Sequence, residues 1–94
     1  MQYSPPVTMD NSPLEFPCDY ALKVMGRAEP EFRTRMLAVL EAHVGPIAPA
    51  QLLERPSRAG KYVALTCTLR AESRAQLDRI YRDLHATGLV LYAL

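Results

Sequence analysis

The chain has 94 residues, of which 49% are hydrophobic, and its 11 basic and 10 acidic side chains give a formal net charge of +1. This length suits one small domain with a single core, and near-neutrality gives no general attraction to nucleic acid or to an anionic membrane. The apolar runs are far shorter than the roughly 20 residues that cross a bilayer, which excludes a transmembrane protein. Two cysteines, Cys18 and Cys67, without a secretion signal indicate a reduced, cytoplasmic protein with no disulfide framework.

The N-terminal segment and the first strand come first in the chain. Residues 1–13 contain three prolines among polar residues and show no helical or strand periodicity, which predicts a disordered tail followed by a single domain over 14–94. From Tyr20 to Gly26 the side chains alternate, with Tyr20, Leu22 and Val24 on one face. This pattern predicts a first strand that is buried on one side.

A helix and an uncertain element follow. Pro30 suits the first turn of a helix, and Gly45-Pro46 ends it. Between them one apolar stripe runs at helical spacing: Phe32, Met36, Val39, Leu40 and Val44. The stretch from Ile47 to Arg55 contains Pro49 and could form a short strand or a helical turn. We predict an edge strand, because an edge does not need the donor that proline lacks.

The second half of the chain begins with its clearest strand, Gly60 to Arg70. Apolar side chains occupy every second position there, at Val63, Leu65, Cys67 and Leu69, and the polar segment 57–60 before it predicts a hairpin. Ser73 and Gln76 form a capping-box pattern that begins a second helix. Its apolar stripe is Leu77, Ile80, Tyr81 and Leu84, and after Gly88 the apolar residues 89–94 predict a last strand that needs cover on both sides.

The order β-α-β-β-α-β predicts an α+β protein with the ferredoxin-like sandwich. Right-handed crossovers place both helices on one face of a four-stranded antiparallel sheet. The other face stays open. By strand alternation it carries Ala21, Lys23, Met25, Tyr62, Ala64, Thr66 and Thr68.

The reactive side chains form no recognisable catalytic set. His43 and His85 lie near helix ends, where a protonated imidazole complements the helix dipole, and neither has metal-ligand spacing to another candidate ligand. Cys67 alternates into the core, while the role of Cys18 stays open, and the carboxylates are scattered. The sequence therefore predicts no enzyme, no catalytic residue, no metal and no cofactor.

Two groups of residues are candidate binding sites. The first is basic: Lys23 and Arg27 at the end of the first strand, with Arg55, Arg58 and Lys61 in the hairpin, could form an anion site beside Gly26 and the following helix, or simply a solvated surface. The second is the open face, where Met25 and Tyr62 suit self-association or a protein partner. Nucleic acid is disfavoured, because the third strand offers one aromatic ring where RNA-recognition domains need several.

Several segments resemble the YbeD family of small bacterial proteins. They are Phe16-Pro17, Lys23-Val24-Met25-Gly26 with Pro30, Pro56-Ser57 with Gly60 and Tyr62, and Leu77, Tyr81 and Leu84 with Val90. The resemblance implies a ferredoxin-like fold related to ACT-type regulatory domains and no assigned activity. It also implies that a small effector would bind after the first strand, near Gly26, commonly at a dimer interface. Ala64 stands where relatives are expected to have serine, and the Asp-x-Pro-Gly loop of ACT domains is absent.

The sequence thus predicts a non-enzymatic regulatory or protein-interaction module that acts through the open sheet face. The alternative is an ACT-like sensor that binds a small anionic metabolite near Gly26, and RNA binding is the least favoured reading. The predicted ligand or partner residues are Lys23, Met25, Gly26, Arg27, Arg58, Lys61 and Tyr62.

Overall fold

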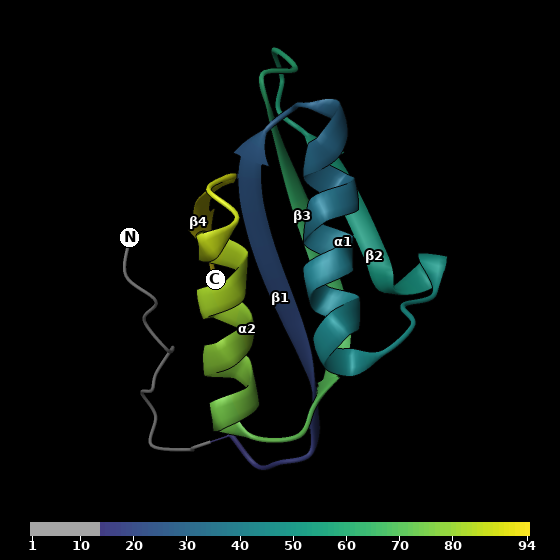
Figure 1. The fold of residues 1–94 in the computed structure, drawn as a ribbon. Helices are drawn as coiled ribbons and strands as arrows, with labels where there is room; N and C mark the ends of the chain where they lie inside the picture. Colours follow the sequence, from purple (N-terminus) through teal and green to yellow (C-terminus); the bar gives the residue numbers. More distant parts are fainter. Residues whose placement is uncertain (1–13) are drawn as a thin grey trace.

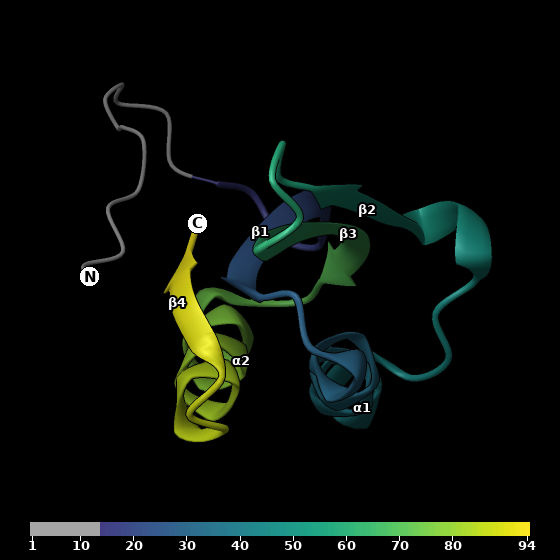
Figure 2. The same ribbon diagram turned by 90° about the horizontal axis from the view of Figure 1, so that it is seen from above.

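The computed structural model describes residues 14–94, so the predicted tail over 1–13 lies outside the described residues. Its elements are β1 (Cys18–Arg27), α1 (Pro30–Val44), β2 (Leu52–Pro56), β3 (Tyr62–Ala71), α2 (Arg74–Ala86) and β4 (Val90–Ala93), with a short 3-10 helix η1 (Pro49–Gln51) before β2. The strands form one antiparallel sheet in the order β2-β3-β1-β4. Both helices cover the same face (Figures 1 and 2). The predicted ferredoxin-like architecture is confirmed.

The two long central strands, β1 and β3, determine which side chains are buried. Their register pairs Leu22 with Cys67 and Val24 with Leu65, and all four of these side chains are at most 1% exposed. Paired residues point to the same face of an antiparallel sheet, so these positions form the layer that packs against the helices. The alternation that was visible in the sequence is the pattern of burial in the structure.

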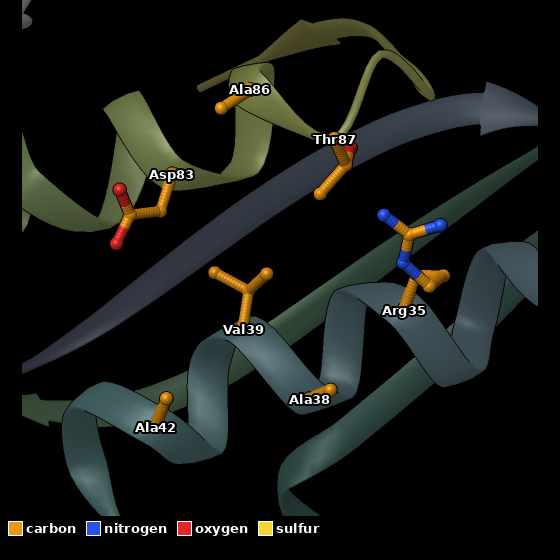
Figure 3. Close-up of a pocket in the computed structure, with 7 residues that line it drawn as sticks. All are labelled: Arg35, Ala38, Val39, Ala42, Asp83, Ala86 and Thr87. Atoms are coloured by element: carbon orange, nitrogen blue, oxygen red, sulfur yellow. The ribbon is translucent and has the colours of Figure 1, made fainter.

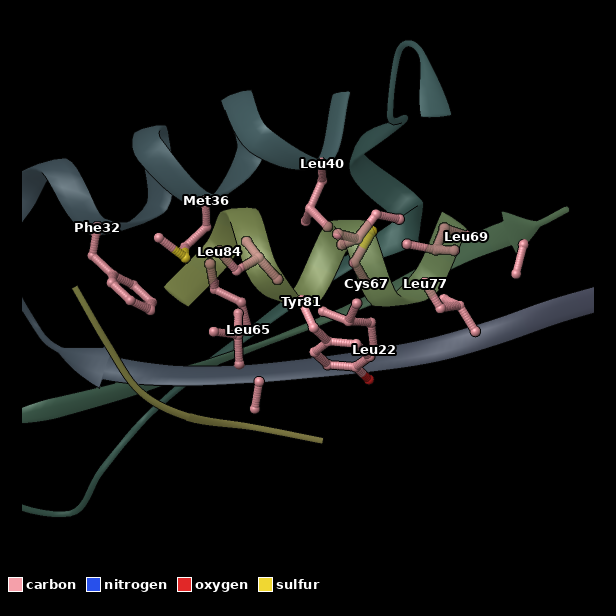
Figure 4. Packing of buried hydrophobic residues seen from close by; sticks show 14 of the residues in the cluster. Leu22, Phe32, Met36, Leu40, Leu65, Cys67, Leu69, Leu77, Tyr81 and Leu84 are labelled. Atoms are coloured by element: carbon pink, nitrogen blue, oxygen red, sulfur yellow. The ribbon is translucent and has the colours of Figure 1, made fainter. Parts of the chain in front are cut away.

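The helix α1 begins at Pro30 and ends before Gly45, as the sequence predicts. Gly45 has φ +82°, which glycine adopts without the Cβ penalty of other residues. Phe32, Met36 and Leu40 are fully buried, while Val39 and Val44 pack partly against the same core. Figure 4 shows the core between the helices and the sheet.

The start of α2 differs in one detail from the predicted capping box. Ser73 Oγ accepts a hydrogen bond from the Gln76 backbone N–H at 3.0 Å, as predicted. The Gln76 side chain instead accepts from the backbone N–H of Glu72, one residue earlier, at 2.8 Å. Both helix-start donors are still satisfied, so the cap retains its stabilising role.

The segment between α1 and β3 corrects the predicted edge strand over Ile47 to Arg55. Pro49–Gln51 forms the 3-10 turn, and the strand begins later, at Leu52. Gln51 explains the change, because its side chain accepts from the Ala48 N–H and donates to the Thr68 carbonyl, 2.8 and 2.9 Å away. The side chain thus fixes the turn against β3, and both of the conformations considered from sequence occur in succession.

Candidate functional site

The face of the sheet that α1 and α2 leave free presents two rows of side chains, which run from β2 through β3 and β1 to β4 or to the residue after it. In the first row, Tyr92 of β4, Met25 of β1, Ala64 of β3 and Arg55 of β2 are neighbours. In the second, Leu94 is hydrogen-bonded to Lys23, which pairs with Thr66, which pairs with Leu53. The helices lie on the opposite side of the sheet (Figure 2). These two rows are called the open face below.

The open face exposes large apolar side chains that a closed core would bury. Leu53 is 58% exposed, Leu94 50% and Tyr92 37%, and Tyr62, beside the first row on β3, is 36% exposed. Six large apolar side chains are exposed within residues 14–94, and these are four of them. Ala64 is only 8% exposed, although it does not belong to the core cluster. Exposed apolar area grouped in this way is typical of an interaction surface.

The predicted basic residues frame this face. Lys23 lies within the second row and Arg55 at the end of the first, while Arg27 ends β1 opposite Tyr62. Arg58 and Lys61 lie in the hairpin, which reaches the start of α1 because the Ala28 N–H donates to the Lys61 carbonyl. None of these five forms an ion pair within residues 14–94. The structure therefore places them along one side of the molecule rather than around Gly26 alone.

Gly26 itself has a packing role. It is buried on the helix-covered face, and a Cβ built there would lie 2.2 Å from Phe32 Cε1 and 2.6 Å from the Leu89 carbonyl oxygen. Only glycine allows α1 and the chain leading into β4 to approach β1 this closely. The predicted ligand contact at Gly26 stays a prediction. A ligand near Gly26 would contact the side chains of neighbouring residues.

A small cavity does lie beside Gly26. It has a volume of about 240 Å³ and is lined by Arg27, Glu29, Phe32, Gly88, Leu89 and Leu91. This is the end of β1 to which the ACT resemblance points. Arg27 could hold an anionic group there, while Glu29 would oppose a second negative charge.

A second hollow lies between α1 and α2, on the side of the molecule opposite the open face. It has a volume of about 420 Å³, and Figure 3 shows side chains of α1 and α2 around it, among them Ala38, Ala42 and Ala86. Its charged lining residues, Arg35 and Asp83, lie on different helices. The groove offers alanines where the open face offers leucine and tyrosine side chains, so it provides few large anchors for a partner.

The histidines and cysteines do not line either hollow, but His43 pairs with Asp83, which lines the hollow between the helices. His43 Nε2 lies 2.7 Å from Asp83 Oδ2 and links the end of α1 to α2. Cys67 is buried, and desolvation raises the pKa of its thiol, which makes it a poor nucleophile. Cys18 is half-buried at the start of β1. Within residues 14–94, no three His, Cys, Asp or Glu side chains gather as a set that could hold a metal ion.

Sequence reasoning missed Tyr92, Leu94 and Leu53 as members of the open face. Residues 89–94 are all apolar, apart from the tyrosine hydroxyl, so no alternation shows which of them face the core. The pairing of Met25 with Tyr92 settles the register. For Leu53 the missing information was the beginning of β2 at Leu52, from which alternation places Leu53 outward.

The sequence has many similar proteins. Residues 11–94 match the family described as "Protein of unknown function (DUF493)". A UPF0250 protein of Paraburkholderia phytofirmans is 39% identical over 87 residues, which cover 93% of this chain and 98% of that protein. A UPF0250 protein of Bordetella pertussis is 41% identical over 85 residues, covering 90% and 93% of the two chains.

Two solved structures share the fold. The solution structure of HP0495 from H. pylori matches with a TM-score of 0.71 at 17% identity, over 99% of this chain and 98% of that one. The C-terminal domain of the MgtC protein from Mycobacterium tuberculosis matches with a TM-score of 0.64, also at 17% identity, over 86% and 88%. At this identity the likeness concerns the fold alone. The family match and the UPF0250 relatives show that the chain belongs to the DUF493 family of proteins of unknown function, which confirms its resemblance to YbeD.

Proposed function

We propose that this protein is a non-enzymatic regulatory or interaction module that binds a protein partner through its open face. One observation carries the proposal: two rows of side chains cross all four strands and expose Leu53, Leu94 and Tyr92. A sheet face with large apolar side chains gains free energy when another element covers it. The family has no assigned activity that would favour a catalytic alternative.

The composition of the open face supports a protein partner. Tyrosine, methionine and arginine are enriched at the centres of protein interfaces, and Tyr92, Met25 and Arg55 stand in one row there. No helix within residues 14–94 is both long and apolar enough to cross a membrane. What favours a protein partner is the composition of the row that holds Tyr92, Met25 and Arg55.

The test is a quantitative pull-down from a lysate of the source cells with two matched variants. Met25→Glu puts a charge in the first row of the open face, whereas Ala38→Glu puts the same charge in the groove between the helices. We expect a protein that wild type and Ala38→Glu retain and Met25→Glu loses. Loss from Ala38→Glu instead would assign binding to the groove. A wild-type chain that retains nothing and runs as a monomer in light scattering would contradict the proposal.

The cavity beside Gly26 favours a second candidate function, the sensing of a small anionic metabolite. Its volume of about 240 Å³ suits a ligand of few atoms, and Arg27 supplies a positive charge. A thermal-shift screen of amino acids, nucleotides and organic acids tests it. A ligand at 100 times its dissociation constant stabilises the folded state by about 2.7 kcal/mol. Arg27→Ala should abolish the shift, and a library without any hit would argue against this function.

A further inference from the structure

The near-neutral chain distributes its charges unevenly between its two sides. The strands and the hairpin of the sheet side carry six basic residues: Lys23, Arg27, Arg55, Arg58, Lys61 and Arg70. Asp19 is the one acidic side chain at an outward strand position within residues 14–94. Glu54 of β2 points to the helix side, where it pairs with Arg33 at 2.8 Å. A net charge of +1 therefore conceals a basic face.

The positive charges of this face are largely uncompensated where the apolar rows lie. Asp19 pairs with Arg70 at 3.3 Å, at the end of the β1–β3 ladder away from the hairpin. The side chains of Lys23, Arg27 and Arg55, which stand in or beside the two rows, form no ion pair within residues 14–94. A partner that brings carboxylates to these positions would be attracted over a distance and held in register.

The same charges argue against two other occupants. A second copy that docked face to face through a two-fold axis would place this basic set against itself, and such like-charge contacts disfavour association. Nucleic acid would satisfy the charges but not the apolar rows, because a phosphate backbone cannot cover aliphatic side chains such as Leu53 and Leu94, which are 58% and 50% exposed. A matching occupant has to be both acidic and apolar.

We infer that the open face binds an acidic amphipathic segment of its protein partner. Large apolar side chains of that segment cover the two rows, and its carboxylates meet Lys23, Arg27 and Arg55. The rows cross four strands, a width of about 14 Å at the usual strand spacing, which an amphipathic helix of about ten residues spans. The inference rests on the proposed function and adds to it the chemistry of the partner.

Designed peptides test this chemistry. The probe is a fluorescent peptide of about 18 residues with leucines at helical spacing and glutamates elsewhere. Controls replace its glutamates by lysine or its leucines by serine, and a single-stranded RNA of similar length tests nucleic acid. We expect the leucine–glutamate peptide to bind at least about tenfold more tightly than each control, and its affinity to fall as salt rises. Equal or tighter binding of the lysine peptide or of the RNA would overturn the inference.

Two charge-reversal variants locate the binding. Lys23→Glu with Arg55→Glu changes the open face, and Arg79→Glu with Arg82→Glu changes the net charge equally at exposed positions of α2. The first pair should lose about tenfold or more in affinity for the acidic peptide and gain affinity for the lysine peptide. The second pair should stay within about twofold of wild type. Equal losses in both pairs would show that net charge alone, and not the open face, governs binding.

The proposed function and the inference about the chemistry of the partner can fail independently. If the Met25→Glu pull-down identifies a partner, its binding segment can be found by crosslinking and mass spectrometry. A neutral or basic segment would overturn the inference and leave the proposed function standing. An acidic segment with large apolar residues supports both.

Discussion

The two faces of the sheet are built from alternate residues of the same strands, and they differ in what covers them. Leu65 of β3 is 1% exposed beneath the helices. Leu53 of β2 pairs with the next residue of β3, Thr66, and is 58% exposed on the open face. The covered face holds the domain together. The open face has comparable apolar side chains that the described fold leaves in water. On the proposed function, the covered face provides stability and the open face provides binding.

The largest expected effect is on the free energy of unfolding, when a leucine of either face is replaced by alanine. Leu65→Ala should lower the free energy of unfolding by about 2–5 kcal/mol, because it leaves a cavity in the core. Leu53→Ala should change it by no more than about 0.5 kcal/mol. Chemical denaturation followed by circular dichroism measures both values. A Leu53→Ala variant as unstable as Leu65→Ala would mean that the open face takes part in the core.

The next effect tests how tightly the covered face is packed. Gly26→Ala should cost about 1–3 kcal/mol of stability, since the added methyl group meets the Phe32 ring and the Leu89 carbonyl. Ala21→Val adds two methyl groups in place of hydrogens on the opposite face of β1, where Ala21 is exposed, and should change stability little. Thermal denaturation compares the two variants. A harmless Gly26→Ala would contradict the close packing at the end of β1.

A smaller effect comes from the helix cap. Ser73→Ala removes the acceptor for the Gln76 N–H and should cost about 1 kcal/mol. Because Ser73 begins a helix of the covering layer, the variant should lose stability but retain full affinity for the leucine–glutamate peptide at a temperature where it is folded. Weaker peptide binding by the folded variant would show that the helices and the open face are coupled.

The smallest expected effect is a pH dependence of stability that arises from the buried thiol of Cys67. Burial raises the pKa of the Cys67 thiol above its ordinary value of 9.0. Above that pH the unfolded chain loses the thiol proton while the folded chain keeps it, so this contribution to stability falls as pH rises. Wild type should therefore lose more stability than Cys67→Ala between pH values below and above 9.0. Equal losses of stability in wild type and Cys67→Ala would show that water reaches the thiol.

The fold was predictable because local patterns agreed with one another. Alternation through Val63, Leu65, Cys67 and Leu69 gave the buried face of β3, and Pro30, Gly45 and Ser73 marked helix ends that the structure reproduces. The β2 boundary was less predictable, because Gln51 fixes the preceding turn through the carbonyl of Thr68, a contact that no local pattern reveals.

The candidate site was only partly predictable, for a related reason. Met25 and Tyr62 were placed on the open face by counting along their strands. Tyr92 and Leu94 needed the pairing of β4 with β1, which an all-apolar segment does not specify. The ion pairs His43–Asp83 and Arg33–Glu54 likewise join residues from different elements. The basic character of the open face becomes visible only when the strands are paired.

The most direct test of the division between the two faces is site-specific photo-crosslinking in the source cells. A photoreactive phenylalanine analogue replaces either Leu53 on the open face or Arg79 on α2, both exposed positions. We predict a discrete protein adduct from position 53 and none from position 79. Adducts from position 79 alone would contradict the assignment of binding to the open face.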